Sequence, residues 1–272
     1  MTEIPDPTRG RPAGVLLAGI DRRAKEGFTG VLRADGPVSG IVVLREGKVV
    51  AAATPEAPGP EPLLLRSGRV AEADWTAAFA EGAPHGRLAE ALVAHGALGA
   101  LGVEVVAATA LADAVFALAL RGVQTCVAAP LDAAETGPLL FLDPGLAADD
   151  VVREAQRRLA MAAEWQERGL TSTAVPASAA AGSATDPLLA AVNGRRNVRG
   201  LAFALGRGLF ATMRSLADLM DAGAVTVSAE PGQAGPPTSQ DAPHEPAPPE
   251  GLPKRLRGAS DVIRVLPFRP DR

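Results

Sequence analysis

The chain has 272 residues, with 27 basic and 31 acidic side chains and a formal net charge of −4. This balance argues against phosphate binding over the whole surface, because proteins of that kind carry a basic excess. A single cysteine excludes an intramolecular disulfide and a cysteine-rich zinc site. Three scattered histidines argue against a catalytic metal centre, and we expect no cofactor and no bound metal.

The beginning of the chain and its longest apolar stretch bear on localisation. Residues 1–11 are polar and contain prolines, and they lack the basic and apolar regions of a secretory signal. The apolar stretch 103–120 contains Glu104 and Asp113 and is mostly alanine, whereas a bilayer span needs about 18–20 apolar residues. We therefore expect a soluble, cytoplasmic protein with no membrane partner.

The first predicted elements are a helix and a small antiparallel sheet. Strands are expected at 28–32, 40–44 and 49–53. The turns between them carry Asp35-Gly36 and Glu46-Gly47-Lys48, and glycine supplies the positive φ that such turns need. The preceding helix should end near Gly27, with an apolar face formed by Val15, Leu16, Leu17 and Ile20.

Helices are expected after the sheet, where prolines between residues 55 and 62 stop the strands. Trp75, Ala78 and Phe79 have the spacing of one buried helix face. A second helix should span 87–95. A third, alanine-rich helix over 103–120 should end at Arg121-Gly122, the order expected for a helix C-terminus.

The middle of the chain contains a strand, a charged helix and a linker. An apolar run at the start of 123–147 predicts a strand, and proline- and glycine-rich loops follow. Residues 149–168 predict a helix with acidic residues in its first turn and Arg168 in its last, as the helix dipole favours. Trp165 should anchor this helix in the core. Residues 171–185 are small and polar, which predicts a flexible linker.

A second compact unit is predicted at 186–228. Asp186 and Pro187 suit the N-cap and the first position of a helix. Three helices and a strand should follow, with four leucines pointing inward: Leu201, Leu205, Leu216 and Leu219. From residue 229 the chain is dense in Pro, Gly, Ser, Gln and acidic residues. Such a segment cannot bury enough apolar surface to offset its ordering entropy, which predicts a disordered tail.

Two sets of motifs within residues 12–125 resemble known modules. The first resembles the amino-terminal domain of PatA-type bacterial regulators and consists of Thr29-Gly30-Val31-Leu32, Gly40-Ile41 and Glu46-Gly47-Lys48-Val49-Val50-Ala51-Ala52. The second is similar to the helical module at the front of secretion-system assembly ATPases and consists of Ser67-Gly68-Arg69-Val70, Trp75 and Gly86-Arg87-Leu88-Ala89-Glu90-Ala91-Leu92-Val93-Ala94-His95-Gly96.

The element order of 186–228 looks like that of a winged helix-turn-helix. Taken whole, the chain resembles actinobacterial proteins described as transcriptional regulators of a winged-helix kind. This resemblance implies regulation and not catalysis.

We predict the α+β class: a small antiparallel β-sheet with helices, followed by a winged-helix-like unit and a disordered tail. The predicted parts are a PatA N-terminal-like α+β domain at 12–147, a connector helix at 148–170, a flexible linker at 171–185, a winged-helix-like domain at 186–228 and a tail with a basic end at 229–272.

DNA binding by 186–228 would place its third helix, 209–222, in the major groove. The groove side would offer Thr212, Arg214 and Ser215, together with Asp218 and Asp221, which phosphates repel. The unit contains five arginines and three aspartates, and this net charge of +2 is small for a protein that binds DNA as a monomer. A homodimer would align two half-site modules. Arg214 would approach base edges, and the residues on phosphates would be Arg195, Arg196, Arg199 and Arg207.

The basic end of the tail is a second candidate binding segment. Lys254, Arg255 and Arg257 form a short basic motif for an acidic partner or nucleic acid. The apolar residues from Val262 to Leu266 suit strand addition to a partner's sheet. The alternative is a solvated extension with neither role.

Catalytic motifs are not evident. Gly206-Arg207-Gly208 lacks the Gly-Lys-Ser/Thr of a phosphate loop and is expected to be a turn between helices. The chain has no Gly-x-Ser-x-Gly nucleophile elbow. Cys126 is expected to be a small buried hydrophobe. His85 and His95 are expected at the surface or at helix ends.

We therefore interpret the chain as a non-enzymatic bacterial regulatory protein, a signalling adaptor that acts in transcriptional control through contacts with a regulatory protein partner. The alternative is a DNA-binding winged-helix transcriptional regulator. An unrecognised hydrolase is a third hypothesis. Binding to DNA would weaken steeply with salt, whereas an adaptor would be indifferent to this change.

Overall fold

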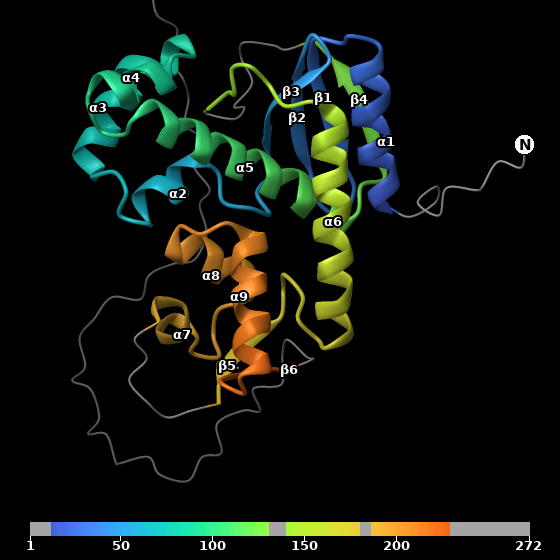
Figure 1. Ribbon diagram of the computed structural model, residues 1–272, viewed down its shortest axis with the longest axis vertical. Helices are drawn as coiled ribbons and strands as arrows, with labels where there is room; N and C mark the ends of the chain where they lie inside the picture. Colours follow the sequence, from blue (N-terminus) through green and yellow to red (C-terminus); the bar gives the residue numbers. More distant parts are fainter. Residues whose placement is uncertain (1–11, 131–139, 180–185, 229–272) are drawn as a thin grey trace, which may run out of the picture. The chain divides into compact units, whose positions relative to one another are not determined.

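The computed structural model describes residues 12–130, 140–179 and 186–228, which form a four-stranded antiparallel sheet, a two-stranded sheet and helices (Figure 1). The predicted α+β class with a small antiparallel sheet is confirmed. The predicted tail at 229–272 lies outside the described residues.

The chain begins with helix α1 (Pro12–Lys25), followed by β1 (Gly30–Asp35), β2 (Gly40–Arg45) and β3 (Lys48–Ala53), as the apolar runs predict. The two central residues of the β2–β3 turn, Glu46 and Gly47, have positive φ, 51° and 77°, a conformation that glycine adopts readily. This is the turn geometry whose twist matches that of paired strands.

Four helices follow the sheet: α2 (Pro60–Leu65), α3 (Glu72–Gly82), α4 (Leu88–Ala94) and α5 (Ala100–Arg121), with a short 3-10 turn at Ala83–His85. The predicted single buried face of α3 is partly wrong. Trp75 and Ala78 are buried, but Phe79 is 40% exposed, and its ring lies 5.9 Å from that of Trp75 at a tilt of 32°.

Strand β4 (Thr125–Ala129) returns after these helices and pairs antiparallel with β1, from Val31 opposite Ala129 to Asp35 opposite Thr125. The strand order is therefore β3-β2-β1-β4. The outer edge of β3 is covered by the segment before the next helix, since Val49 and Leu146 exchange backbone hydrogen bonds of 2.9 Å. Strand β4 forms the other edge of the sheet.

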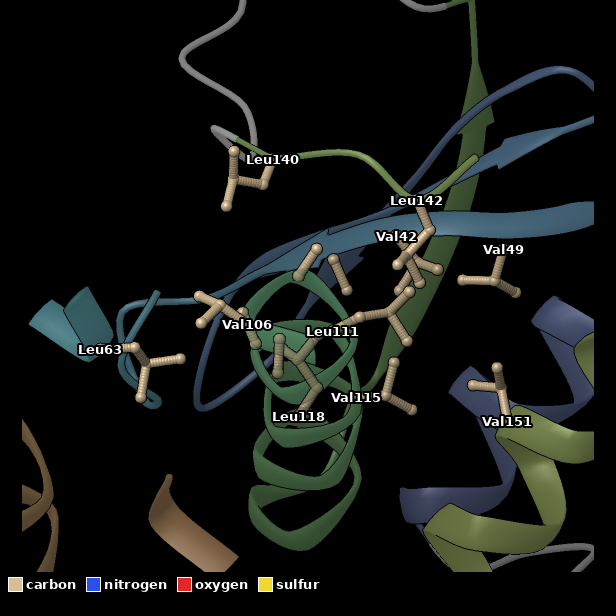
Figure 2. Packing of buried hydrophobic residues seen from close by; sticks show 14 of the residues in the cluster. Val42, Val49, Leu63, Val106, Leu111, Val115, Leu118, Leu140, Leu142 and Val151 are labelled. Carbon is tan, nitrogen blue, oxygen red and sulfur yellow. The ribbon is translucent and has the colours of Figure 1, made fainter. Parts of the chain in front are cut away.

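The main hydrophobic core lies between the sheet and α5. Alternate residues of the strands, such as Leu32, Val42 and Leu44, are buried in it, as the period of two along a strand requires. Figure 2 shows side chains of α5 in the same cluster as Val42 of β2 and Val49 of β3. Helix α5 is long and apolar enough to span a membrane, but 67% of its apolar 18-residue stretch is buried inside the protein.

The rest of the described chain forms one long helix and a small helical unit. Its elements are α6 (Ala148–Glu167), β5 (Val175–Ser178), α7 (Pro187–Ala191), α8 (Val198–Leu205), α9 (Leu209–Asp221) and β6 (Val225–Ser228). The helices of 186–228 lie where the sequence predicts them, and the Asp186 side chain accepts a hydrogen bond from the Leu188 N–H at 2.8 Å, as an N-cap does.

The flexible-linker prediction is wrong for residues 175–178. These residues form β5, which pairs antiparallel with β6 from Val175 opposite Ser228 to Ser178 opposite Val225. The physical reason is that β6 needs a partner for its backbone groups, and a short segment with one β-branched residue is sufficient to supply it. Residues 180–185 lie outside the described residues.

The second hydrophobic cluster contains residues of α5 and α6 as well as of the helical unit. Phe116 and Ala117 of α5 and Trp165 of α6 are buried together with Leu201 and Phe210. All described residues belong to one compact unit. The predicted boundaries at 148 and 186 therefore do not separate independently packed cores, and α6 packs against α1, α5 and α9 instead of connecting distant domains.

Candidate functional site

Helices α8 and α9 and the turn between them contain most of the residues that the sequence predicts to face DNA. The turn at residues 206–208 is confirmed: Gly206 ends α8 with a φ of 58°, and Gly208 is the N-cap of α9. A Cβ at Gly206 would lie 2.4 Å from backbone atoms of Pro62 and Ser67. Glycine is thus needed there for conformation and for the close approach to α2.

The first turn of α9 is buried against α5 and α6. Leu209 is 1% exposed and Phe210 is 7% exposed. The Phe210 ring lies 5.3 Å from that of Phe116 on α5, edge to face, and 5.4 Å from that of Trp165 on α6. These are the distances at which aromatic pairs attract one another beyond their apolar burial.

The prediction that Thr212 faces a DNA groove is wrong. Its side chain is fully buried, and its hydroxyl donates to the Gly208 carbonyl at 2.9 Å within the helix. Of the residues predicted on the groove side, Arg214, Asp218 and Asp221 are exposed, and Ser215 is half-buried. The exposed face of α9 therefore carries more acidic than basic side chains.

A buried carboxylate on α5, that of Asp113, lies at the N-terminus of α9. Asp113 is 2% exposed, and a Cβ at Gly208 would come 2.3 Å from its Oδ2 atom. Its Oδ1 accepts a hydrogen bond from Arg158 Nη1 of α6 at 2.8 Å, whereas Oδ2 has no hydrogen bond of good geometry. Burial raises the pKa of Asp113, and the Arg158 charge and the Leu209 and Phe210 amides oppose this rise. Asp113 thus occupies the positive end of α9 from another helix.

Arg158 joins this carboxylate to two further groups. Its Nε donates to Glu154 Oε1 at 2.7 Å, and its guanidinium lies 4.8 Å from the centre of the Phe210 ring. Hydrogen bonds from Arg157 and Arg158 lower the pKa of Glu154 to about 2 against the opposing effect of burial. We call Asp113, Arg158 and Phe210 the α5–α6–α9 junction.

A second ionic contact ties the helical unit to the first half of the chain. Glu56, which follows β3 and is nearly buried, accepts a hydrogen bond from Arg199 of α8, and Arg121 at the end of α5 lies 3.8 Å from it. Arg199 was predicted as a phosphate contact, but the structure places its guanidinium on a carboxylate of the same chain.

The other residues predicted to contact nucleic acid differ in their exposure and in their contacts within the protein. Arg195 and Arg196 are adjacent and exposed in the turn between α7 and α8, and Arg214 is exposed on α9. Arg207 is half-buried and donates to the Ser215 hydroxyl at 3.1 Å. The predicted partner-binding residues of the tail lie outside the described residues: Lys254, Arg255 and Arg257.

Residues that titrate or ligate metals do not converge in the described residues. No group of three or more His, Cys, Asp or Glu side chains that could hold a metal ion is found among them. His95 Nε2 lies 2.8 Å from Glu81 Oε2 on the surface, and His85 is exposed, both as predicted for helix-end residues. Cys126 was predicted to be buried, but it is only half-buried, because it lies on β4 at the edge of the sheet.

The junction residues were missed at the sequence level. Asp113 is a single acid within an alanine-rich helix, and it was used only to argue against a membrane span. A lone carboxylate on the buried part of an apolar helix is itself a signal, since such a group needs a partner. The partner, Arg158, is one of several arginines on a charged helix, and no local spacing singles it out.

No family of known proteins, no curated protein and no solved structure matches this chain.

Proposed function

We propose that the protein is a non-enzymatic bacterial regulator of the cytoplasm, an adaptor that works through protein–protein contacts, with transcriptional control as its output. The helix-turn-helix in this proposal is a docking module and not a reader of DNA. The partner is a regulatory protein.

One observation carries this proposal: the first turn of α9 is built into the protein's own core. Recognition helices read base edges mainly with their N-terminal residues. Here those residues, Leu209 and Phe210, are covered by α5 and α6, and the carboxylate of Asp113 occupies the helix N-terminus. A phosphate backbone brought to this end of α9 would meet a buried negative charge where a DNA-binding helix offers free amides.

The alternative, a DNA-binding winged-helix regulator, is favoured by a different observation. Arg195 and Arg196 are exposed next to each other, and the sequence between α7 and α8 presents them on a turn beside Gly194. Together with Arg214 they would supply phosphate contacts without any use of the first turn of α9. The structure leaves three of the five predicted arginines available for this role.

The two functions separate in one titration. Full-length protein is titrated into fluorescent genomic duplexes at low and at physiological salt, and anisotropy is measured. The adaptor proposal predicts no sequence-selective binding, and no change on Arg195→Ala or Arg196→Ala relative to the control Arg69→Ala, whose side chain is exposed on the other half of the protein.

Tight binding that weakens steeply with salt would overturn the adaptor proposal in favour of DNA binding. Removal of an arginine that contacts a phosphate would then reduce the slope of log affinity against log salt concentration by about one. Arg214→Ala would relax the sequence preference.

A further inference from the structure

Strand β4 presents an unprotected edge of the main sheet. It pairs with β1 on one side only, and no described residue pairs with its other side. In an antiparallel pair, alternate residues direct their N–H and C=O groups away from the partner strand. Protein edges are usually blunted by charges, proline or a bulge, but Thr125–Ala129 has the sequence TCVAA, and its pairing with β1 shows no register shift.

The same strand is poorly covered on its faces. None of its five residues is buried, and Val127, which lies opposite Arg33 of β1, is 56% exposed. The opposite edge of the sheet, β3, is covered by the segment that contains Leu146. The absence of an equivalent cover within the described residues is therefore a property of this one edge.

A groove runs beside β4 on the side of α1. It has a volume of about 260 Å³ and is lined by Val15, Ala18, Gly19 and Arg22 of α1 and by Cys126 of β4. A Cβ at Gly19 would lie 3.1 Å from Cys126 Sγ, so the glycine keeps the helix close to the strand. Val15 is 40% exposed at this groove. An exposed sheet edge with a side-chain pocket beside it is where proteins take up extended peptides as an added strand.

The charge at this groove favours one kind of occupant. Arg22 is exposed and has no ion-pair partner among the described residues, whereas its neighbours Arg23 and Lys25 pair with Glu26 and Asp21. Arg22 and Arg23 both oppose the burial that raises the pKa of the Cys126 thiol, which places their charges near the groove, with Asp35 as the acidic group that acts against them. A carboxylate is therefore complementary in charge to this site.

We propose that the edge of β4 and the α1–β4 groove bind an extended segment of a partner protein as an added β-strand, with an apolar side chain in the groove and a carboxylate beside Arg22. This inference rests on the proposed adaptor function, because it names the site and the chemistry of the partner. Main-chain hydrogen bonds to β4 supply affinity, and the groove and Arg22 supply selectivity.

The test uses full-length protein and a displayed library of random peptides of about ten residues, enough for one strand. The expected selection is for peptides that alternate apolar residues with Asp or Glu. A fluorescein-labelled copy of the selected peptide should bind Arg22→Glu at least about tenfold more weakly, because a charge pair becomes a repulsion. It should bind Arg69→Glu, a charge reversal at an exposed arginine away from the groove, within about twofold of the parent.

Cys126 supplies an independent reading, because it is the chain's one cysteine and lines the groove. Its reaction with a disulfide reagent such as DTNB should slow when the peptide is bound. The proposal is overturned if no alternating acidic peptide is selected, or if the selected peptide binds Arg22→Glu as well as the parent and leaves the thiol reactivity unchanged.

Thiol protection that grows with protein concentration in the absence of peptide would also overturn it, since the edge would then pair with a second copy. The outcomes are separable from those of the adaptor proposal. Tight duplex binding would overturn the adaptor proposal regardless of the peptide results. Failed peptide selection without duplex binding would overturn only the proposed strand-addition site.

Discussion

The sheet half and the helical unit of this protein are stabilised in different ways. In the sheet half, the strands β1, β2 and β3 are joined by short turns and share a core with the apolar helix α5. The helical unit has a two-stranded sheet and three helices of its own, but its core is completed by Phe116, Ala117 and Trp165 from α5 and α6. It is also held by the nearly buried carboxylate of Glu56, which pairs with Arg199, and its helix α9 begins beside the buried carboxylate of Asp113.

This difference shows what a small unit needs in order to be stable. A segment of about 40 residues buries too little apolar surface to fold alone, so residues 186–228 depend on the apolar face that α5 turns away from the sheet. One helix thus serves two cores, with Leu111 and Val115 in the first and Phe116 in the second.

The largest effect is expected from Phe210→Ala. This change removes a ring packed between Phe116 and Trp165 and leaves a cavity, which costs about 3–5 kcal/mol for a buried phenylalanine. The free energy of unfolding is measured in urea by tryptophan fluorescence and circular dichroism. Phe79→Ala is the matched control, because its ring is partly exposed, and it should cost under about 1 kcal/mol. Equal losses for the two variants would contradict the dependence of the helical unit on α5 and α6.

An intermediate effect is expected from Asp113→Ala at neutral pH. The variant leaves Arg158 with Glu154 alone and removes the carboxylate beside the N-terminus of α9. Removal of one member of a buried ion pair costs about 3 kcal/mol. Asp113→Asn should cost less, because its amide oxygen can still accept the hydrogen bond from Arg158.

The pH dependence of unfolding tests the same group. Because its folded-state pKa is raised above the ordinary value of 3.8, the folded state holds this proton more tightly. The contribution of Asp113 to stability is therefore greatest below about pH 3.8 and decreases as the pH rises through the raised folded-state value. This decrease should be absent in Asp113→Asn, and an unchanged pH profile in that variant would contradict the assignment.

The elements that follow from local patterns were predictable, and those that depend on chain crossings were not. The β2–β3 turn and the end of α5 at Gly122 follow from glycine at positions that need positive φ, and the structure confirms both. Strand β5 was missed because its four residues carry little strand signal, and its partner β6 lies far along the chain. The pairing of Asp113 with Arg158 depends on where α5 crosses α6. The sequence periodicity of either helix does not determine this crossing point.

The smallest effect is expected from Glu154→Gln, and its sign distinguishes Glu154 from Asp113. Hydrogen bonds from Arg157 and Arg158 lower the pKa of Glu154 from 4.5 to about 2. A depressed carboxyl pKa stabilises the fold above about pH 4.5, and this contribution is lost as the pH falls through about 2. Since the Glu154 side chain is 36% exposed, solvent screening limits the contribution to under about 1 kcal/mol. Unfolding curves of the parent and Glu154→Gln should therefore differ slightly at pH 7 and converge near pH 2, whereas Asp113→Asn alters the profile in the opposite direction. Parent and Glu154→Gln curves that diverge further in acid would show that Glu154 does not balance the charge of Arg158 at the junction.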